Sequence, residues 1–397
     1  MATSKYASNV ITGDITNANI NTAKKVRDVT KRLWDLYDTN NQAPLLALLS
    51  QLSFDRSARN PKHEWFGKDL RPRYDTVAGT ITNNGTAAIT FAPTNLSYFR
   101  INDGVRFLGV TGNTNYGYVS AKGASTITVS SIDGSTTLPT IAAGTNIHIT
   151  GPSMGGESTM PSGKHVQDTN DYNYPQFLRE PATIDLWQLG QENYTGPEEQ
   201  ERSMEDLRAI RVAFEDLLFR GERAVLTGAS DGTKYFMRGL EQFLLNDGYA
   251  NNILDWRAGL TQDQWDQYLI DGPCKYGSQR KLMFLSSSLF LQLHQFEKNE
   301  KRMTGRDNVI GISFIKYLAP NGKEIFMHQH HLFDGPYEGD GFIVDAEYIS
   351  LLPYANNKPF MYLEDVGAND ASAKSNEYWL IATEEVSRTE VHGFVHK

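Results

Sequence analysis

Residues 195–221, which read TGPEEQERSMEDLRAIRVAFEDLLFRG, decide how the rest of the chain is interpreted. They predict one long helix, because Pro197 opens an acidic first turn and Arg220-Gly221 is typical of a helix end. About 22 residues at a rise of 1.5 Å each give a rod of about 33 Å. Its apolar side chains recur at helical spacing and form one stripe, made of Met204, Leu207, Ile210, Phe214, Leu217 and Leu218.

The charges of this helix are unevenly distributed. An apolar stripe is usually a core face, and the remaining charged side chains usually face water. Here, however, the acidic start contrasts with four arginines at 208, 211, 220 and 223 toward the end. Long extended segments also flank the helix in the sequence. The order of segments around the helix is therefore more informative than any single motif.

The composition describes a folded, mildly acidic protein. The chain has 397 residues, 40% of them hydrophobic, and 38 basic against 47 acidic residues leave a formal net charge of -9. This balance offers no general attraction to nucleic acid or to anionic membranes. The single cysteine, Cys274, excludes an intramolecular disulfide framework and fits a reducing cytosol. No stretch has the character of a signal peptide or membrane span, so we expect neither secretion nor insertion.

The segments before residue 75 alternate between irregular and helical patterns. Residues 1–22 are rich in Asn, Thr, Ala and Ser, which predicts an extended arm. Apolar spacing predicts helices at Lys24–Tyr37 and at Pro44–Leu52, where Pro44 suits a first helical turn. Residues 60–74 contain two prolines and predict an extended connection.

Between residues 75 and 150 the composition changes to Thr, Ser, Gly and Asn with few charges. Short alternating runs at 80–82, 88–91, 105–108 and 125–129 are separated by turn residues, which predicts a small antiparallel β unit. From Gly151 to Asn193 the chain is punctuated by Pro and Gly, so we expect mostly irregular structure there.

After residue 233 the pattern predicts a mixed unit of helices and strands, which makes the fold class α+β. We expect helices at Gly239–Asn246, after the capping box Thr261-Gln-Asp-Gln264, and after a cap at Ser288, running to about Asn299. We expect strands at Lys281–Leu285, Ile312–Tyr317, Glu324–His330, Gly341–Val344 and, near the C-terminus, Glu377–Thr383.

The search for reaction chemistry finds three weak candidates. Gly151-Pro-Ser153-Met-Gly155 matches the pattern of a serine nucleophile, but the glycines and proline that follow break the helix this motif requires, so a turn is favoured. His328, His330 and His331 lie in a strand-like run without a third ligand at suitable spacing, so a polar strand face or a subunit contact is favoured over a metal. Residues 168–173 resemble a calcium loop only at their start, so a turn-rich loop is expected. We predict no catalytic residue, metal or cofactor.

Four stretches carry a resemblance to a known family. They are Asn60-Pro-Lys-His-Glu-Trp65, Thr169-Asn-Asp-Tyr-Asn-Tyr-Pro-Gln176, the pair Ile325–Phe333 with Gly341-Phe-Ile-Val-Asp345, and Glu377-Tyr-Trp-Leu380. Together with the order of segments, they resemble the major head proteins of the SU-ten-like podoviruses, which have the Hong Kong 97 capsid fold. The resemblance covers residues 60–397, and residues 1–59 match less well.

The resemblance implies a division of the chain into five parts. These are an N-terminal arm with helices (1–59), an extended E-loop region with an inserted β domain at about 75–150 (60–196), a peripheral domain with the spine helix (197–232), an axial domain (233–354) and return strands of the peripheral domain (355–397). Interface or spine-helix roles are expected for Trp65, Leu207, Arg208, Ile210, Arg211, Phe214, Leu217 and Arg220.

The function implied is that of a major capsid protein in a virion. Such a protein forms hexamers and pentamers of itself, contacts a portal and possible scaffold or decoration proteins, touches packaged DNA non-specifically, and assembles in the host cytoplasm. Two other functions stay open at this point. The β unit is suited to binding carbohydrate or a host surface in another phage structural protein, and a hydrolase based on Ser153 is a distant third.

Overall fold

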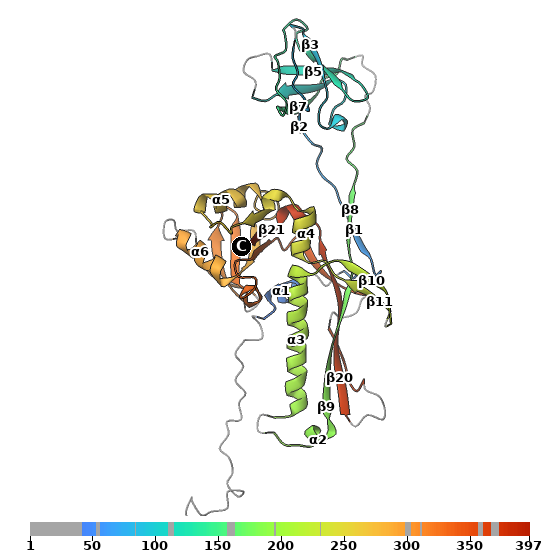
Figure 1. Cartoon of the computed structure of the whole chain (residues 1–397), viewed down its shortest axis with the longest axis vertical. Coiled ribbons are helices and arrows are strands. Elements are labelled where there is room, and N and C mark those ends of the chain that lie inside the picture. The colour runs from blue at the N-terminus through green and yellow to red at the C-terminus, as the bar shows by residue number, and fades with distance from the viewer. Residues whose placement is uncertain are drawn as a thin grey trace, which may run out of the picture. The chain divides into compact units, whose positions relative to one another are not determined.

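The computed structural model describes residues 42–52, 56–83, 85–109, 115–156, 163–193, 196–230, 232–297, 303–309, 312–355, 360–366 and 373–397. The arm expected at 1–22 and the helix expected at Lys24–Tyr37 lie outside these residues. The chain divides into two compact units, one formed by Phe66–Asp171 and the other by the residues on either side of it. Both helices and strands are abundant in the larger unit, so the fold class is α+β, as predicted (Figure 1).

The long helix α3, Glu198–Arg220, confirms the predicted helix and packs against a four-stranded sheet (Figure 1). The sheet consists of β9 (Gln176–Asp185), β20 (Ala373–Val386), β18 (Ile349–Pro353) and β19 (Phe360–Leu363). β20 is its central strand, because β9 pairs antiparallel along one edge and β18 and β19 follow one another along the opposite edge. The predicted strand Glu377–Thr383 is therefore the middle of β20.

The expectation of irregular structure from Gly151 to Asn193 is wrong. That region contains β8 (Thr169–Asn173), the ten-residue strand β9 and the short helix α2 (Leu186–Leu189). In β9 the buried residues Ala182 and Ile184 alternate with exposed ones, as in a half-buried strand. Pro181 disguises this pattern, but a proline is tolerated because β9 lies at the edge of its sheet among the described strands.

A seven-stranded sheet is the other large sheet of the larger unit. Its order is β12 (Ile253–Asp255), β21 (Gly393–His396), β17 (Gly341–Val344), β13 (Arg280–Leu285), β16 (Glu324–Gln329), β15 (Ile312–Leu318) and β14 (Met303–Val309). Alternate residues of β13 enter different cores, with Phe284 in one and Met283 and Leu285 in the other. The sheet is thus buried on both faces, which explains the continuous apolar runs in its strands.

Helices cover both faces of this sheet. α1 (Pro44–Leu52), α3 and α4 (Leu240–Asp247) contribute to the core that holds Phe284, whereas α5 (Gln262–Asp271) and α6 (Ser287–Glu297) contribute to the other. The predicted capping box at Thr261 is confirmed in both of its hydrogen bonds. Ser288 is not the cap of α6 but lies inside it, and Ser286 Oγ accepts the hydrogen bond from the N–H of Leu289 at 3.4 Å. No described helix is both long and apolar enough to span a membrane.

The unit Phe66–Asp171 contains the predicted β structure. Its sheet has the order β2 (Tyr74–Thr76), β7 (Asn146–Pro152), β4 (Asp103–Phe107), β5 (Tyr116–Lys122), β6 (Ile127–Ser131) and β3 (Ala88–Phe91). The bridge between Val77 and Pro93 joins the two outer strands, so the sheet closes on itself around an apolar interior. The run expected at 80–82 contributes only the isolated bridge of Ile81.

Two further pairs of strands complete the fold. β1 (His63–Gly67) pairs with β8, and β10 (Ala224–Ala229) pairs with β11 (Gly232–Phe236) as an antiparallel hairpin. The five-part division stays a prediction. Strands on the two sides of its boundary at 354/355 pair with one another. β18 precedes the boundary yet pairs with β20, whereas β21 follows it and pairs with β12 and β17.

Candidate assembly site

The buried face of α3 lies in the main hydrophobic core. Ile210 and Phe214 are 2% and 0% exposed, and Leu207 and Leu217 pack half-buried against the same core. Met204, predicted as part of the stripe, is 62% exposed. At 100° per residue Met204 lies about 80° around the helix from Phe214, which takes it off the buried face. The stripe prediction thus holds for the second half of α3 and is wrong at its start.

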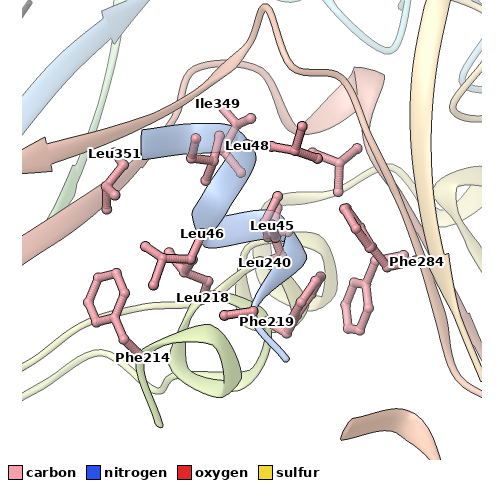
Figure 2. Packing of buried hydrophobic residues seen from close by; sticks show 14 of the residues in the cluster. Leu45, Leu46, Leu48, Phe214, Leu218, Phe219, Leu240, Phe284, Ile349 and Leu351 are labelled. Atoms are coloured by element: carbon pink, nitrogen blue, oxygen red, sulfur yellow. The ribbon is translucent and has the colours of Figure 1, made fainter. Parts of the chain in front are cut away.

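The helix α1 packs on this face through its leucines. Leu45, Leu46 and Leu48 are each at most 3% exposed. Figure 2 shows them among Phe214, Leu218 and Leu240 on one side and Ile349 and Leu351 of β18 on the other. A segment from the N-terminal part of the chain thereby joins α3 to the four-stranded sheet.

Glu215 of α3 fixes the start of α1. Its Oε1 accepts a hydrogen bond from the N–H of Leu45 at 2.8 Å, and its Oε2 accepts one from the N–H of Leu46 at 2.7 Å. The first N–H groups of a helix have no partner within the helix, so this carboxylate replaces a capping side chain. His330 Nε2 lies 3.0 Å from Glu215 Oε1, and both side chains are fully buried. Hydrogen bonds to a charged acceptor are about twice as strong as neutral ones, so α1 is held firmly.

Arg220, the last residue of α3, also connects the helix to neighbouring elements. Its Nη1 donates to Asp340 Oδ2 at 3.0 Å and to Glu241 Oε2 at 3.4 Å, and its guanidinium lies 3.4 Å from the centre of the Tyr337 ring. Burial raises the pKa of the Glu241 carboxyl, and the charge of Arg220 opposes that rise. Arg220 therefore links the end of α3 to α4 and to the turn before β17.

The other predicted site residues lie around the same helix. Arg211 places its guanidinium 5.4 Å from the ring centre of Phe360 in β19, and Trp65 is 9% exposed with its ring centre 6.0 Å from that of Phe243 in α4. Arg208 is a half-buried residue of α3. Trp65 and the α3 residues thus meet around one core, and a subunit-interface role for them stays a prediction.

Sequence reasoning missed the buried polar groups of the core. Lys281 Nζ donates to Asp345 Oδ2 at 2.9 Å and to the carbonyl of Val391 at 2.8 Å, with both charged side chains 0% exposed. Burial lowers the pKa of Lys281. It also acts to raise the pKa of Asp345, but Lys281 and Ser278 outweigh it and hold that pKa below its usual range. The only signal in the sequence is a lysine at the start of an apolar strand.

The residues that were considered for catalysis or metal binding make contacts within the fold. Ser153 is an exposed residue directly after β7, where its N–H donates to the carbonyl of Asn102. His328 Nδ1 lies 3.1 Å from the Ser313 carbonyl, and burial lowers its pKa. Among the residues that the structure describes, no three histidine, cysteine or acidic side chains gather in a way that would hold a metal ion.

Residues 169–173, expected as part of a turn-rich loop, form β8 instead. The buried amide of Asn173 bridges backbone from distant parts of the chain, because its Nδ2 donates to the carbonyls of Arg238 and Glu384 at 2.9 and 2.8 Å. Residues 169–173 are thus an extended strand and do not form the turn-rich loop of a calcium site.

The side chains of this site therefore hold the chain's own elements in place around α3. Their chemistry is that of a structural protein, in which one long helix organises a sheet, a docked helix and a buried hydrogen-bond network.

Comparison with known proteins supplies the particular class. The sequence model of the family described as SU10 major capsid protein matches residues 11–396. The chain belongs to this family, and it is a shell-forming capsid protein of a virion. No curated protein matches the sequence significantly.

Several solved structures are similar to this chain at low sequence identity. The capsid of a native GTA particle has 8% identity and a TM-score of 0.47, covering 100% of this chain and 98% of that one. The SrpI encapsulin of Synechococcus elongatus has 11% identity and a TM-score of 0.43, covering 58% and 77%. The capsid of cyanophage P-SCSP1u has 10% identity and a TM-score of 0.40, covering 62% and 80%.

Proposed function

We propose that copies of this chain assemble, through hexamers and pentamers, into an icosahedral head shell that encloses a phage genome. The observation that carries this proposal is the family match over residues 11–396, nearly the whole chain. Closed shells require one subunit to make several different contacts with its copies, and such contacts add through multivalency even where each one is weak.

Exposed apolar side chains support the proposal. Trp187 and Leu186 of α2 are 81% and 57% exposed, and Phe66 and Leu70 are 73% and 94% exposed. Large aromatic side chains that face water are enriched where proteins bind one another. We assign these two segments, 186–187 and 66–70, to contacts between subunits.

We propose that the parts of the chain correspond to those of the Hong Kong 97 fold. α3 is the spine helix of the peripheral domain, and residues 233–354 form the axial domain. The β structure at about 75–150 is carried on the E-loop and overlaps a neighbouring subunit. Because the sheet of that β structure closes on itself, its edges are not available for strand addition. Its contacts must therefore be made by side chains.

The proteins and nucleic acid that the shell would contact follow from this assignment. The shell would join a portal, any scaffold or decoration protein would bind its inner or outer surface, and the packaged DNA would be contacted non-specifically. The net charge of -9 supports weak contact, since a mildly acidic wall does not trap a polyanion. Assembly would take place in the host cytoplasm, and no catalytic step is required for it.

The test is imaging of particles formed by the purified chain, with averaging of the rings from which they are built. The proposal predicts both fivefold and sixfold rings, and particles that contain neither would contradict it. Deleting residues 76–150 addresses the alternative of a carbohydrate-binding or host-binding module. Loss of assembly without a change in surface binding supports the shell, whereas intact assembly with loss of surface binding supports the alternative.

A further inference from the structure

Glu384 is an acidic side chain inside the main hydrophobic core. Leu380, Ala382 and Val386 of β20 belong to that core, and Glu384 takes the next place in the same alternation along the strand. It is 0% exposed, and among the described residues neither of its carboxyl oxygens has a hydrogen-bond partner. Burial, with a smaller contribution from the charge of Glu215, raises the pKa of Glu384 well above its usual range. Burial without a hydrogen-bond partner therefore favours the protonated, neutral form of this side chain while the core stays closed.

The helix α1 covers the face on which Glu384 lies. Glu384 is paired directly with Leu351 of β18, and paired residues of adjacent strands point to the same face. Leu351 packs in the same cluster as the leucines of α1, and α1 contacts both β18 and α3 (Figure 2). Departure of α1 would consequently expose this part of the core, including the carboxyl group of Glu384, to water.

We propose that α1 is docked by a proton-linked latch, in which α1 covers Glu384 only while that side chain is protonated, and ionisation of Glu384 releases α1 from Glu215. The two carboxyl groups act together. Glu215 holds the start of α1 through its two carboxylate oxygens, and its charge repels any charge that appears on Glu384. One proton on Glu384 thereby controls whether the N-terminal helix stays on the body of the subunit.

The charged groups around the latch determine its direction. α3 contributes Glu215, and the residue after β16 is His330, which pairs with Glu215. The sequences of α1 and β18, PLLALLSQL and ISLLP, contain no titratable side chain. Glu385, with its partners His63 and Arg56, belongs to the opposite face of β20 by strand alternation.

The direction of the pH dependence follows from the raised pKa. In the docked state Glu384 keeps its proton to a higher pH than it does when hydrated, where a glutamate titrates near about 4.3. Docking is therefore strongest below that ordinary value and weakens as the pH rises toward the raised one. The docking equilibrium changes by at most roughly tenfold per pH unit in this window.

The experiment uses the full-length chain over a range of pH. Infrared spectroscopy detects the carbonyl band of a protonated carboxylic acid, and hydrogen exchange reports the protection of the α1 amides after correction for the intrinsic exchange rate. The wild-type chain should keep the band above the pH at which hydrated glutamates ionise and lose it as the pH rises further, with α1 protection falling in parallel. Glu384→Gln should remove the band and leave α1 protection level across the same range.

A second variant and a matched control keep the test decisive. Glu384→Leu resembles its apolar neighbours and should also abolish the pH dependence, so it replaces Glu384→Gln if that variant does not fold. Glu385→Gln changes the adjacent residue on the other face and should retain both the band and the loosening of α1. The proposal is overturned if the wild type loses the band together with its hydrated carboxyl groups, if α1 protection does not change with pH, or if the Glu384 variants behave like wild type.

Discussion

Replacing Glu215 by alanine should detach α1 from the body of the subunit. The change removes the acceptor of two charged hydrogen bonds, from the N–H groups of Leu45 and Leu46, and the partner of His330. Each such hydrogen bond contributes about 1.5 to 3 kcal/mol, and the change leaves two buried N–H donors without their acceptor. Because the terms are not additive, we expect a loss of about 3 to 5 kcal/mol in the free energy of unfolding.

Two measurements check this expectation. Urea unfolding of the unassembled chain gives the change in stability, and hydrogen exchange shows whether the α1 amides lose protection first. Glu215→Gln keeps one oxygen acceptor and should cost less than Glu215→Ala. Glu205→Ala, an exposed acidic position on the same helix, should stay within about 0.5 kcal/mol of wild type. A Glu215→Ala chain as stable as the Glu205→Ala control would refute the reasoning.

Three further changes test other parts of the account. Phe214→Ala should cost about 3 to 5 kcal/mol in urea unfolding because the side chain is fully buried, whereas Met204→Ala on the same helix should change stability by less than about 0.5 kcal/mol. Arg220→Met should cost about 3 to 5 kcal/mol in urea unfolding because it leaves Asp340 without its cation, and an unchanged unfolding curve would contradict the role given to Arg220. Trp187→Ala should leave the unfolding curve unchanged while reducing the yield of particles in sedimentation, since the side chain is 81% exposed; an unchanged yield would remove α2 from the proposed contacts.

The parts of the fold that could be predicted depend on local spacing. The ends of α3, the bounds of α1 and the capping box at Thr261 are each encoded within a few consecutive residues, and all three are confirmed. β9 was missed because its pairing with β20 supplies the pattern that its own sequence, interrupted by Pro181, does not display. A strand whose partner lies nearly 200 residues away leaves little trace in a short window.

The candidate site was predictable only in its apolar half. Ile210 and Phe214 follow from the helical stripe, but nothing near Glu215 in the sequence indicates that its carboxylate caps a helix 170 residues earlier. Glu384 is similar, because a glutamate in an alternating strand is expected to face water until the fold shows which face is covered. Buried charges are set by tertiary contacts, and the sequence pattern alone places them on the surface.

The central claim is that this chain builds a shell from copies of itself. Negative-stain electron microscopy of the purified chain at high concentration tests it most directly. We expect large closed or tubular particles with a regular surface lattice. A chain that stays a compact monomer at every concentration and salt condition examined would contradict it.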